Sequence, residues 1–76
     1  MSKAVTKQLV VCVANEGYEA SLEKRKIYVA LGDAAADKHG LLRVIDESGE
    51  DYLYPKTFFH SIALSPSVKK AVLAAA

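Results

Sequence analysis

The fold of this chain is decided by the stretch Gly49-Glu50-Asp51-Tyr52-Leu53-Tyr54-Pro55-Lys56-Thr57-Phe58-Phe59-His60-Ser61-Ile62. A glycine turn rich in acidic residues leads into a short aromatic strand. The strand ends at Pro55, because proline has no backbone N–H to donate to a sheet. A tight turn follows, and a last strand is expected from Phe59 to Leu64. This order of elements is typical of a small, closed β-barrel.

Three further strands are expected upstream of this stretch. Leu9–Val13 is short, rich in β-branched residues and apolar on both faces, which indicates a strand buried on both sides or nearly so. Tyr18–Lys26 is polar and charged and predicts a long surface loop. Ile27–Leu31 and Leu41–Asp46 have strand patterns, and the segment Asp33–Gly40 between them carries signals for one capped helical turn. The chain is therefore expected to have five strands.

A short helix is expected at the C-terminal end. Ser65-Pro66-Ser67 combines a hydroxyl cap with a proline suited to the first helical position, and good helix formers follow to Ala76. The apolar positions Val68, Val72 and Leu73 form one stripe. Because so short a helix is unstable alone, we expect it to dock on the barrel or on a second subunit.

The composition fits a single domain. The chain has 76 residues, of which 51% are hydrophobic and 25% charged, and its net charge is +1. We expect one domain over residues 1–76, with the barrel at about 7–64 and the helix at about 66–75. The single cysteine, Cys12, excludes an internal disulfide and fits a reducing, cytoplasmic compartment. No export signal and no membrane span is expected from the short apolar runs.

The core is expected to form from apolar residues of the predicted strands. The candidates are Leu9, Val11, Val13, Ile27, Val29, Leu31, Val44, Leu53, Phe59 and Ile62.

The segment from Tyr54 to Ile62 resembles a motif of Src-homology-three-like barrels. In that family a hydrophobic-Pro-Ser-Asn-Tyr-Val segment precedes the last strand through a one-turn 3₁₀ helix. Here Pro55 stands at the proline, Thr57 at the asparagine, Phe58 at the tyrosine and Phe59 at the core valine. The block from Glu16 to Ile62 also looks like small uncharacterised bacterial proteins of this barrel type. The resemblance implies a mainly β protein, a five-stranded Src-homology-three-like barrel with a short C-terminal helix.

The resemblance does not extend to the ligand groove. Members of the family that bind polyproline use a tryptophan after the second loop and a tyrosine cluster in the first loop. This chain has no Trp, and its first strand ends in Val13-Ala14-Asn15-Glu16 rather than an aromatic-acidic-aromatic sequence. Only Pro55 and Phe58 carry over to groove positions, so the resemblance implies the barrel without implying polyproline recognition.

The aromatic residues are the strongest candidates for a binding surface. Tyrosine joins an apolar ring to a polar hydroxyl and is favoured where a protein surface binds a partner. Tyr52 and Tyr54 share one face of their predicted strand, since strand side chains alternate. The full set of partner-binding candidates is Tyr18, Tyr28, Tyr52, Tyr54, Pro55 and Phe58. The alternative is that these rings only flank a small core.

Other chemistry has weaker support. The basic residues of Lys24-Arg25-Lys26, Lys56 and Lys69-Lys70 could contact phosphates, but acidic residues are nearly as numerous. The acidic hairpin at residues 46–51 lacks the ligand spacing of a calcium loop. No sequence pattern indicates a catalytic, metal or cofactor site. We therefore expect a non-catalytic protein-interaction module or accessory subunit with an unidentified protein partner, without excluding self-association through the C-terminal helix. A nucleic-acid-binding barrel is the alternative.

Overall fold

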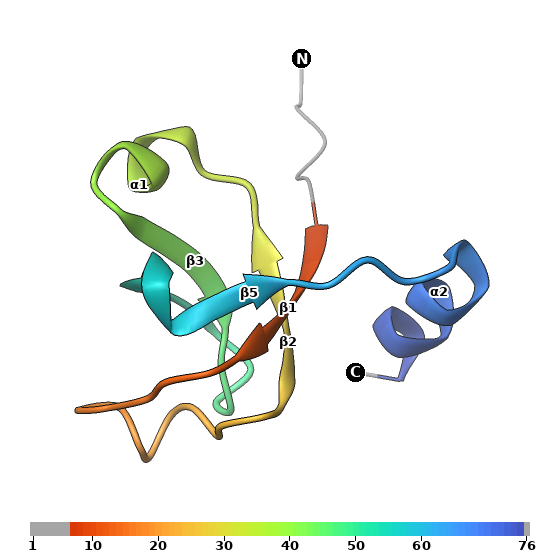
Figure 1. The fold of residues 1–76 in the computed structure, drawn as a ribbon, viewed down its shortest axis with the longest axis horizontal. Helices are drawn as coiled ribbons and strands as arrows, with labels where there is room; N and C mark the ends of the chain where they lie inside the picture. Colours follow the sequence, from red (N-terminus) through yellow and green to blue (C-terminus); the bar gives the residue numbers. More distant parts are fainter. Residues whose placement is uncertain (1–6, 76) are drawn as a thin grey trace.

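The computed structural model, which describes residues 7–75, is built on five strands and two short α-helices. The strands are β1 (Lys7–Cys12), β2 (Ile27–Leu31), β3 (Leu41–Ile45), β4 (Asp51–Pro55) and β5 (Phe59–Ser61). The helices are α1 (Ala34–Lys38), the 3₁₀ helix η1 (Lys56–Phe58) and α2 (Pro66–Ala74). The five strands form one antiparallel sheet in the order β4-β3-β2-β1-β5 (Figure 1). The predicted mainly β class with a C-terminal helix is therefore confirmed.

The sheet has two edges. Within residues 7–75 no backbone ladder joins β4 to β5, so the closed barrel expected from the sequence is not seen in the strand pairing. The sheet nevertheless curls strongly. Tyr54 on β4 and Phe59 on β5 come from opposite edges, yet their ring centroids lie 6.3 Å apart. The two edge strands therefore cover the same core through side chains rather than through backbone hydrogen bonds.

The connections at Pro55 and in α1 follow the sequence closely. β4 ends at Pro55, and the chain turns at once into η1, as predicted for Lys56-Thr57-Phe58. In α1 the Asp33 carboxylate accepts a hydrogen bond from the Ala36 N–H at 3.0 Å, which caps the helix. Gly40 then has a φ of +71°, a conformation that favours glycine.

The C-terminal helix lies to the side of the sheet, beyond β1 and β2 as seen in Figure 1. Its start matches the prediction, because Ser65 caps the helix and Pro66 is its first residue. None of its residues is buried. Val72 and Leu73 are half-buried and Val68 is exposed, so the predicted apolar stripe is only partly covered in the single chain. Neither α-helix among the described residues has the length and apolar character needed to cross a membrane.

The core lies on the concave face of the sheet. Its members are Val10, Cys12, Leu22, Tyr28, Ala30, Val44, Tyr54 and Phe59. Of the predicted core residues, Leu9, Val44 and Phe59 are buried.

Several other predicted core residues are not buried. Val13, Ile27 and Leu53 are 45%, 40% and 41% exposed. The remaining four, Val11, Val29, Leu31 and Ile62, are only half-buried. The cause is strand alternation, because the inward face of β2 carries Tyr28 and Ala30. Two tyrosines fill much of the interior that aliphatic side chains were expected to fill.

The loop between β1 and β2 also differs from the prediction of a surface excursion. It inserts Leu22, which is 1% exposed, into the core. The Asn15 side-chain amide donates to the Leu22 carbonyl at 2.9 Å, and the Glu47 N–H donates to the Ser21 carbonyl at 3.2 Å. The loop is therefore fixed to the β3–β4 hairpin.

A candidate interaction site lined by tyrosines

The six predicted partner-binding residues do not form one surface. Tyr28 and Tyr54 are 5% and 3% exposed and belong to the core. Tyr18 and Tyr52 are 41% and 49% exposed. Pro55 and Phe58, the remaining two, are half-buried. The expectation of a shared exposed face therefore needs correction for Tyr28 and Tyr54, which point inward because the sheet curls around them.

Three of these tyrosines meet at one pocket of about 380 Å³ at the hairpin end of the molecule. We call it the tyrosine pocket. It is lined by Tyr18, Ser21, Asp46, Ser48, Tyr52, Leu53 and Tyr54. The first two residues come from the β1–β2 loop, the next two from the β3–β4 hairpin, and the last three from β4. The pocket thus depends on the loop folding back onto the hairpin.

The aromatic rings at the pocket support one another. The Tyr18 ring meets the buried Tyr54 ring edge to face, with centroids 5.0 Å apart and planes at 85°. It also meets the Phe58 ring at 6.0 Å. Such pairs add to the stability of ring packing and hold each ring in a defined orientation. The exposed Tyr18 is therefore a fixed wall of the pocket rather than a free loop side chain.

The other predicted residues lie elsewhere. Pro55 pairs with Leu41 at the far end of β4 and does not line the pocket. Tyr28 packs inside against Phe59, with ring centroids 6.4 Å apart. Phe58 supports Tyr18 from behind without lining the pocket itself.

A buried carboxylate forms part of the pocket. Asp46 is 7% exposed. Its Oδ2 accepts a hydrogen bond from the Tyr54 hydroxyl at 2.5 Å, and its Oδ1 accepts from the Ser48 N–H at 2.8 Å and from the Ser48 hydroxyl. Burial opposes ionisation, but the hydrogen bonds from Ser48 and Tyr54 outweigh it and lower the pKa of Asp46. Burial, with the bond to Asp46, raises the pKa of Tyr54 to about 12.

A second tyrosine–carboxylate pair fixes the same hairpin. The Tyr28 hydroxyl donates to Glu47 Oε2 at 2.5 Å and accepts from the Glu23 N–H at 2.7 Å. Lys26 forms an ion pair with Glu47 at 2.6 Å. Hydrogen bonds from Lys26 and Tyr28 hold the pKa of Glu47 below its ordinary value, and burial raises the pKa of Tyr28. The β3–β4 hairpin is therefore bound to the core through two carboxylates, Asp46 and Glu47, which accept hydrogen bonds from the buried tyrosines Tyr54 and Tyr28.

The charges near the pocket are not all balanced. Glu47 is paired with Lys26, and Asp51 is paired with Arg43 at 3.0 Å. Within residues 7–75 neither Asp46 nor Glu50 has a Lys or Arg partner in an ion pair. Glu50 instead accepts a hydrogen bond from the exposed Tyr52 hydroxyl at 3.1 Å. The pocket end of the molecule thus carries excess negative charge.

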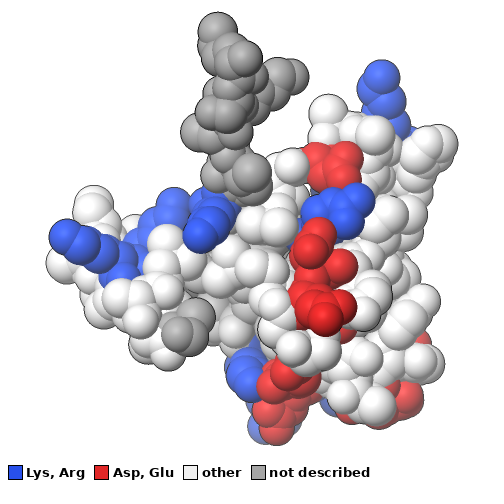
Figure 2. Space-filling model, turned by 180° about the vertical axis from the view of Figure 1, so that it is seen from behind, with Lys and Arg blue, Asp and Glu red and all other residues white. Residues whose placement is uncertain are grey.

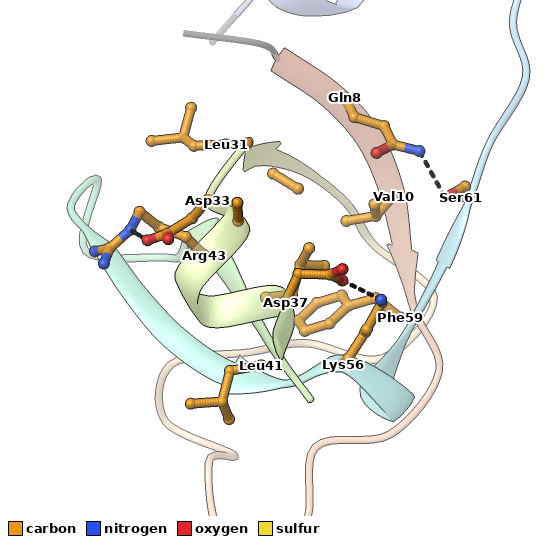
Figure 3. Close-up of a pocket in the computed structure, with 14 residues that line it drawn as sticks. Gln8, Val10, Leu31, Asp33, Asp37, Leu41, Arg43, Lys56, Phe59 and Ser61 are labelled. Atoms are coloured by element: carbon orange, nitrogen blue, oxygen red, sulfur yellow. Dashed lines mark hydrogen bonds and ion pairs between the residues drawn. The ribbon is translucent and has the colours of Figure 1, made fainter. Parts of the chain in front are cut away.

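A larger cavity of about 420 Å³ lies at the opposite end, beside α1 (Figure 3). Apolar residues including Val10 and Phe59 line it, and polar side chains stand around them. These polar groups are already engaged with one another. Gln8 donates to the Ser61 hydroxyl at 2.6 Å, Arg43 pairs with Asp33 at 2.8 Å, and Lys56 pairs with Asp37. The cavity therefore offers a ligand few free polar groups.

Catalytic and metal chemistry gain no support from the described residues. Within residues 7–75 no group of three or more His, Cys, Asp or Glu side chains could hold a metal ion. Cys12 is fully buried, and burial raises the pKa of its thiol, which disfavours the reactive thiolate. His39 and His60 are both exposed.

Four residues of the pocket, Ser21, Asp46, Ser48 and Leu53, were missed as site residues in the sequence. Leu53 was expected in the core instead, because it alternates with the two tyrosines of its strand. Ser21 lies in a loop whose path depends on tertiary contacts. Asp46 and Ser48 were recognisable as turn residues, and the acidic character of the hairpin next to Tyr52 was the available signal. That signal indicates a turn equally well, so it could not identify a pocket alone.

Comparisons with protein-family models, with curated proteins and with solved structures found no match to this chain.

Proposed function

We propose that this protein is a non-catalytic interaction module or accessory subunit that binds a protein partner at the tyrosine pocket. The observation that carries the proposal is the exposure of Tyr18 and Tyr52 at a shared pocket. Exposed, well-supported aromatic rings are typical anchor points of protein–protein interfaces. The packing of the Tyr18 ring against Tyr54 and Phe58 matters too, because a ring already held in place loses little freedom on binding.

We also propose that the fold is a partly open barrel of the Src-homology-three-like kind. The one-turn 3₁₀ helix η1 between β4 and β5 supports this, since it occupies the position of the corresponding helix in that family. The contact between Tyr54 and Phe59 across the open edges supports it as well. A cytoplasmic location is part of the same proposal and rests on the single, buried Cys12.

Nucleic-acid binding is the weaker alternative. Several basic side chains are already paired with carboxylates, among them Lys26, Arg43 and Lys56. On the face shown in Figure 2, acidic side chains gather near the centre, and basic side chains gather on the α2 side. No continuous basic stripe crosses that face. Phosphate binding requires positive charge along the backbone path, and the charges on this face do not provide such a path.

The proposal is tested by comparative affinity capture from the native cell with mass spectrometry. Wild-type protein should retain a partner protein that Tyr18→Ala and Tyr52→Ala both lose, because each removes one exposed ring. Tyr52→Phe should retain it, since the ring remains. The matched control Lys38→Ala alters an exposed residue of α1, at the opposite end of the molecule.

The nuclease arm separates the two candidate functions. Capture should be unchanged after nuclease treatment if the partner is a protein bound directly. Identical captured proteins for wild type and both alanine variants, with folding intact by circular dichroism, would refute the aromatic site. Loss of every specific partner after nuclease treatment would favour the nucleic-acid alternative.

A further inference from the structure

We propose that the tyrosine pocket recognises a cationic segment of its partner, a lysine or arginine side chain entering between Tyr18 and Tyr52. This inference rests on the proposed function and adds the chemistry of the partner. The starting observation is that the two most exposed rings of the pocket stand beside a hairpin with four acidic residues and no basic residue at positions 46–51.

The aromatic walls suit a cation. The face of a tyrosine ring carries partial negative charge and attracts an ammonium or guanidinium group placed over it. The same pairing already occurs within the protein, where Lys26 Nζ lies 5.7 Å from the centroid of the Tyr28 ring. Tyr18 and Tyr52 are the exposed tyrosines that line the pocket, so their faces remain accessible to a cation from another molecule.

The carboxylates suit the same ligand. Asp46 lines the pocket and stays ionised, since hydrogen bonds from Ser48 and Tyr54 favour its charged form. Among the described residues it has no Lys or Arg partner, and neither has Glu50. A cation in the pocket would therefore balance charge that the protein itself leaves unbalanced. A phosphate or an acidic peptide would meet repulsion at the same place.

The size of the site limits what can enter. A pocket of about 380 Å³ accepts one long side chain with its neighbouring backbone rather than a folded domain surface. The apolar stem of lysine or arginine can lie along the rings, and the charged end can reach the carboxylates. The occupant is therefore a peptide segment with at least one basic residue.

The inference is tested by titrating isotope-labelled protein with an eight-residue peptide of alternating arginine and serine, followed by nuclear magnetic resonance. The matched peptide has glutamine in place of arginine. Amide signals of residues around the pocket should shift with the arginine peptide, and binding should weaken at higher salt. Tyr52→Ala and Glu50→Gln should each weaken binding at least tenfold, while glutamine at position 50 keeps an acceptor for the Tyr52 hydroxyl.

The control Asp37→Asn removes the same charge from α1 at the other end and should bind like wild type. Equal shifts from the arginine and glutamine peptides would refute the cationic preference but leave the aromatic site standing. Absence of pocket shifts with the arginine peptide at millimolar concentration would also overturn the inference. The proposed function is judged separately by the capture experiment, so the two can fail independently.

Discussion

Replacing Tyr54 by phenylalanine tests whether the buried hydroxyl–carboxylate pair holds the hairpin in place. The ring would keep its contacts with Tyr18 and Phe59, so the change removes a single hydroxyl. Asp46, which is 7% exposed, would lose the partner of its Oδ2 and keep only the two bonds from Ser48. A buried charged group left short of a hydrogen bond costs about 2 kcal/mol.

That cost is large for a chain of this size. For a domain of 60–100 residues, a loss of about 2 kcal/mol corresponds to a decrease in Tm of about 8–16 °C. The assay is thermal and urea unfolding followed by circular dichroism at neutral pH. Tyr52→Phe is the matched control, because it removes an exposed hydroxyl bonded to Glu50, and it should change stability by less than about 0.5 kcal/mol.

The pH dependence gives a second check on the same variant. The folded state lowers the pKa of Asp46, so the stabilisation from its charged form is present above the ordinary carboxyl pKa and is lost as the pH falls through the folded value. The difference between wild type and Tyr54→Phe should therefore shrink in acid. If Tyr54→Phe were as stable as wild type at neutral pH, or if Tyr52→Phe cost as much, the reasoning would be wrong.

Two further outcomes are expected. Leu22→Ala should lower the free energy of unfolding by about 2–5 kcal/mol in urea, because the Leu22 side chain is only 1% exposed. Leu53→Ala should lower it by less than about 1 kcal/mol, because Leu53 is 41% exposed. The reverse order would contradict the assignment of the inward face. Burial raises the pKa of Tyr54 to about 12 and keeps its hydroxyl neutral in the folded state. The free energy of unfolding should therefore be constant up to pH about 10, the ordinary tyrosine pKa, and decrease as the pH approaches about 12. A free energy of unfolding in urea that stays constant to pH about 12 would contradict this.

The sequence was sufficient to predict where the elements lie. Pro55 marks the end of β4, Ser65-Pro66 marks the start of α2, and Gly40 marks the end of the α1 turn, because each has a backbone restriction or freedom that acts locally. These signals need no knowledge of the rest of the chain. The strand and helix positions were therefore predicted within a few residues.

The orientation of the strands could not be predicted in the same way. β1 and β2 are apolar on both faces, so their patterns do not show which face is inward. The inward placement of Tyr28 requires partners for its buried hydroxyl, which are the Glu23 N–H of the β1–β2 loop and the Glu47 carboxylate of the β3–β4 hairpin. The tyrosine pocket could not be predicted from the sequence either, since Tyr18 and Tyr52 meet there only after the β1–β2 loop has folded onto the β3–β4 hairpin.

The pairing of β5 with β1 has a consequence for how the chain is made. Cys12 pairs with Phe59, so β1 is paired on its second edge only after β5 has been synthesised. Until then β1 presents free backbone groups flanked by Leu9, Val10 and Val11, the kind of edge that recruits a strand from another chain. Folding of the sheet can be completed only after β5 has been synthesised. Conditions that keep incomplete chains dilute should therefore favour correct folding over aggregation.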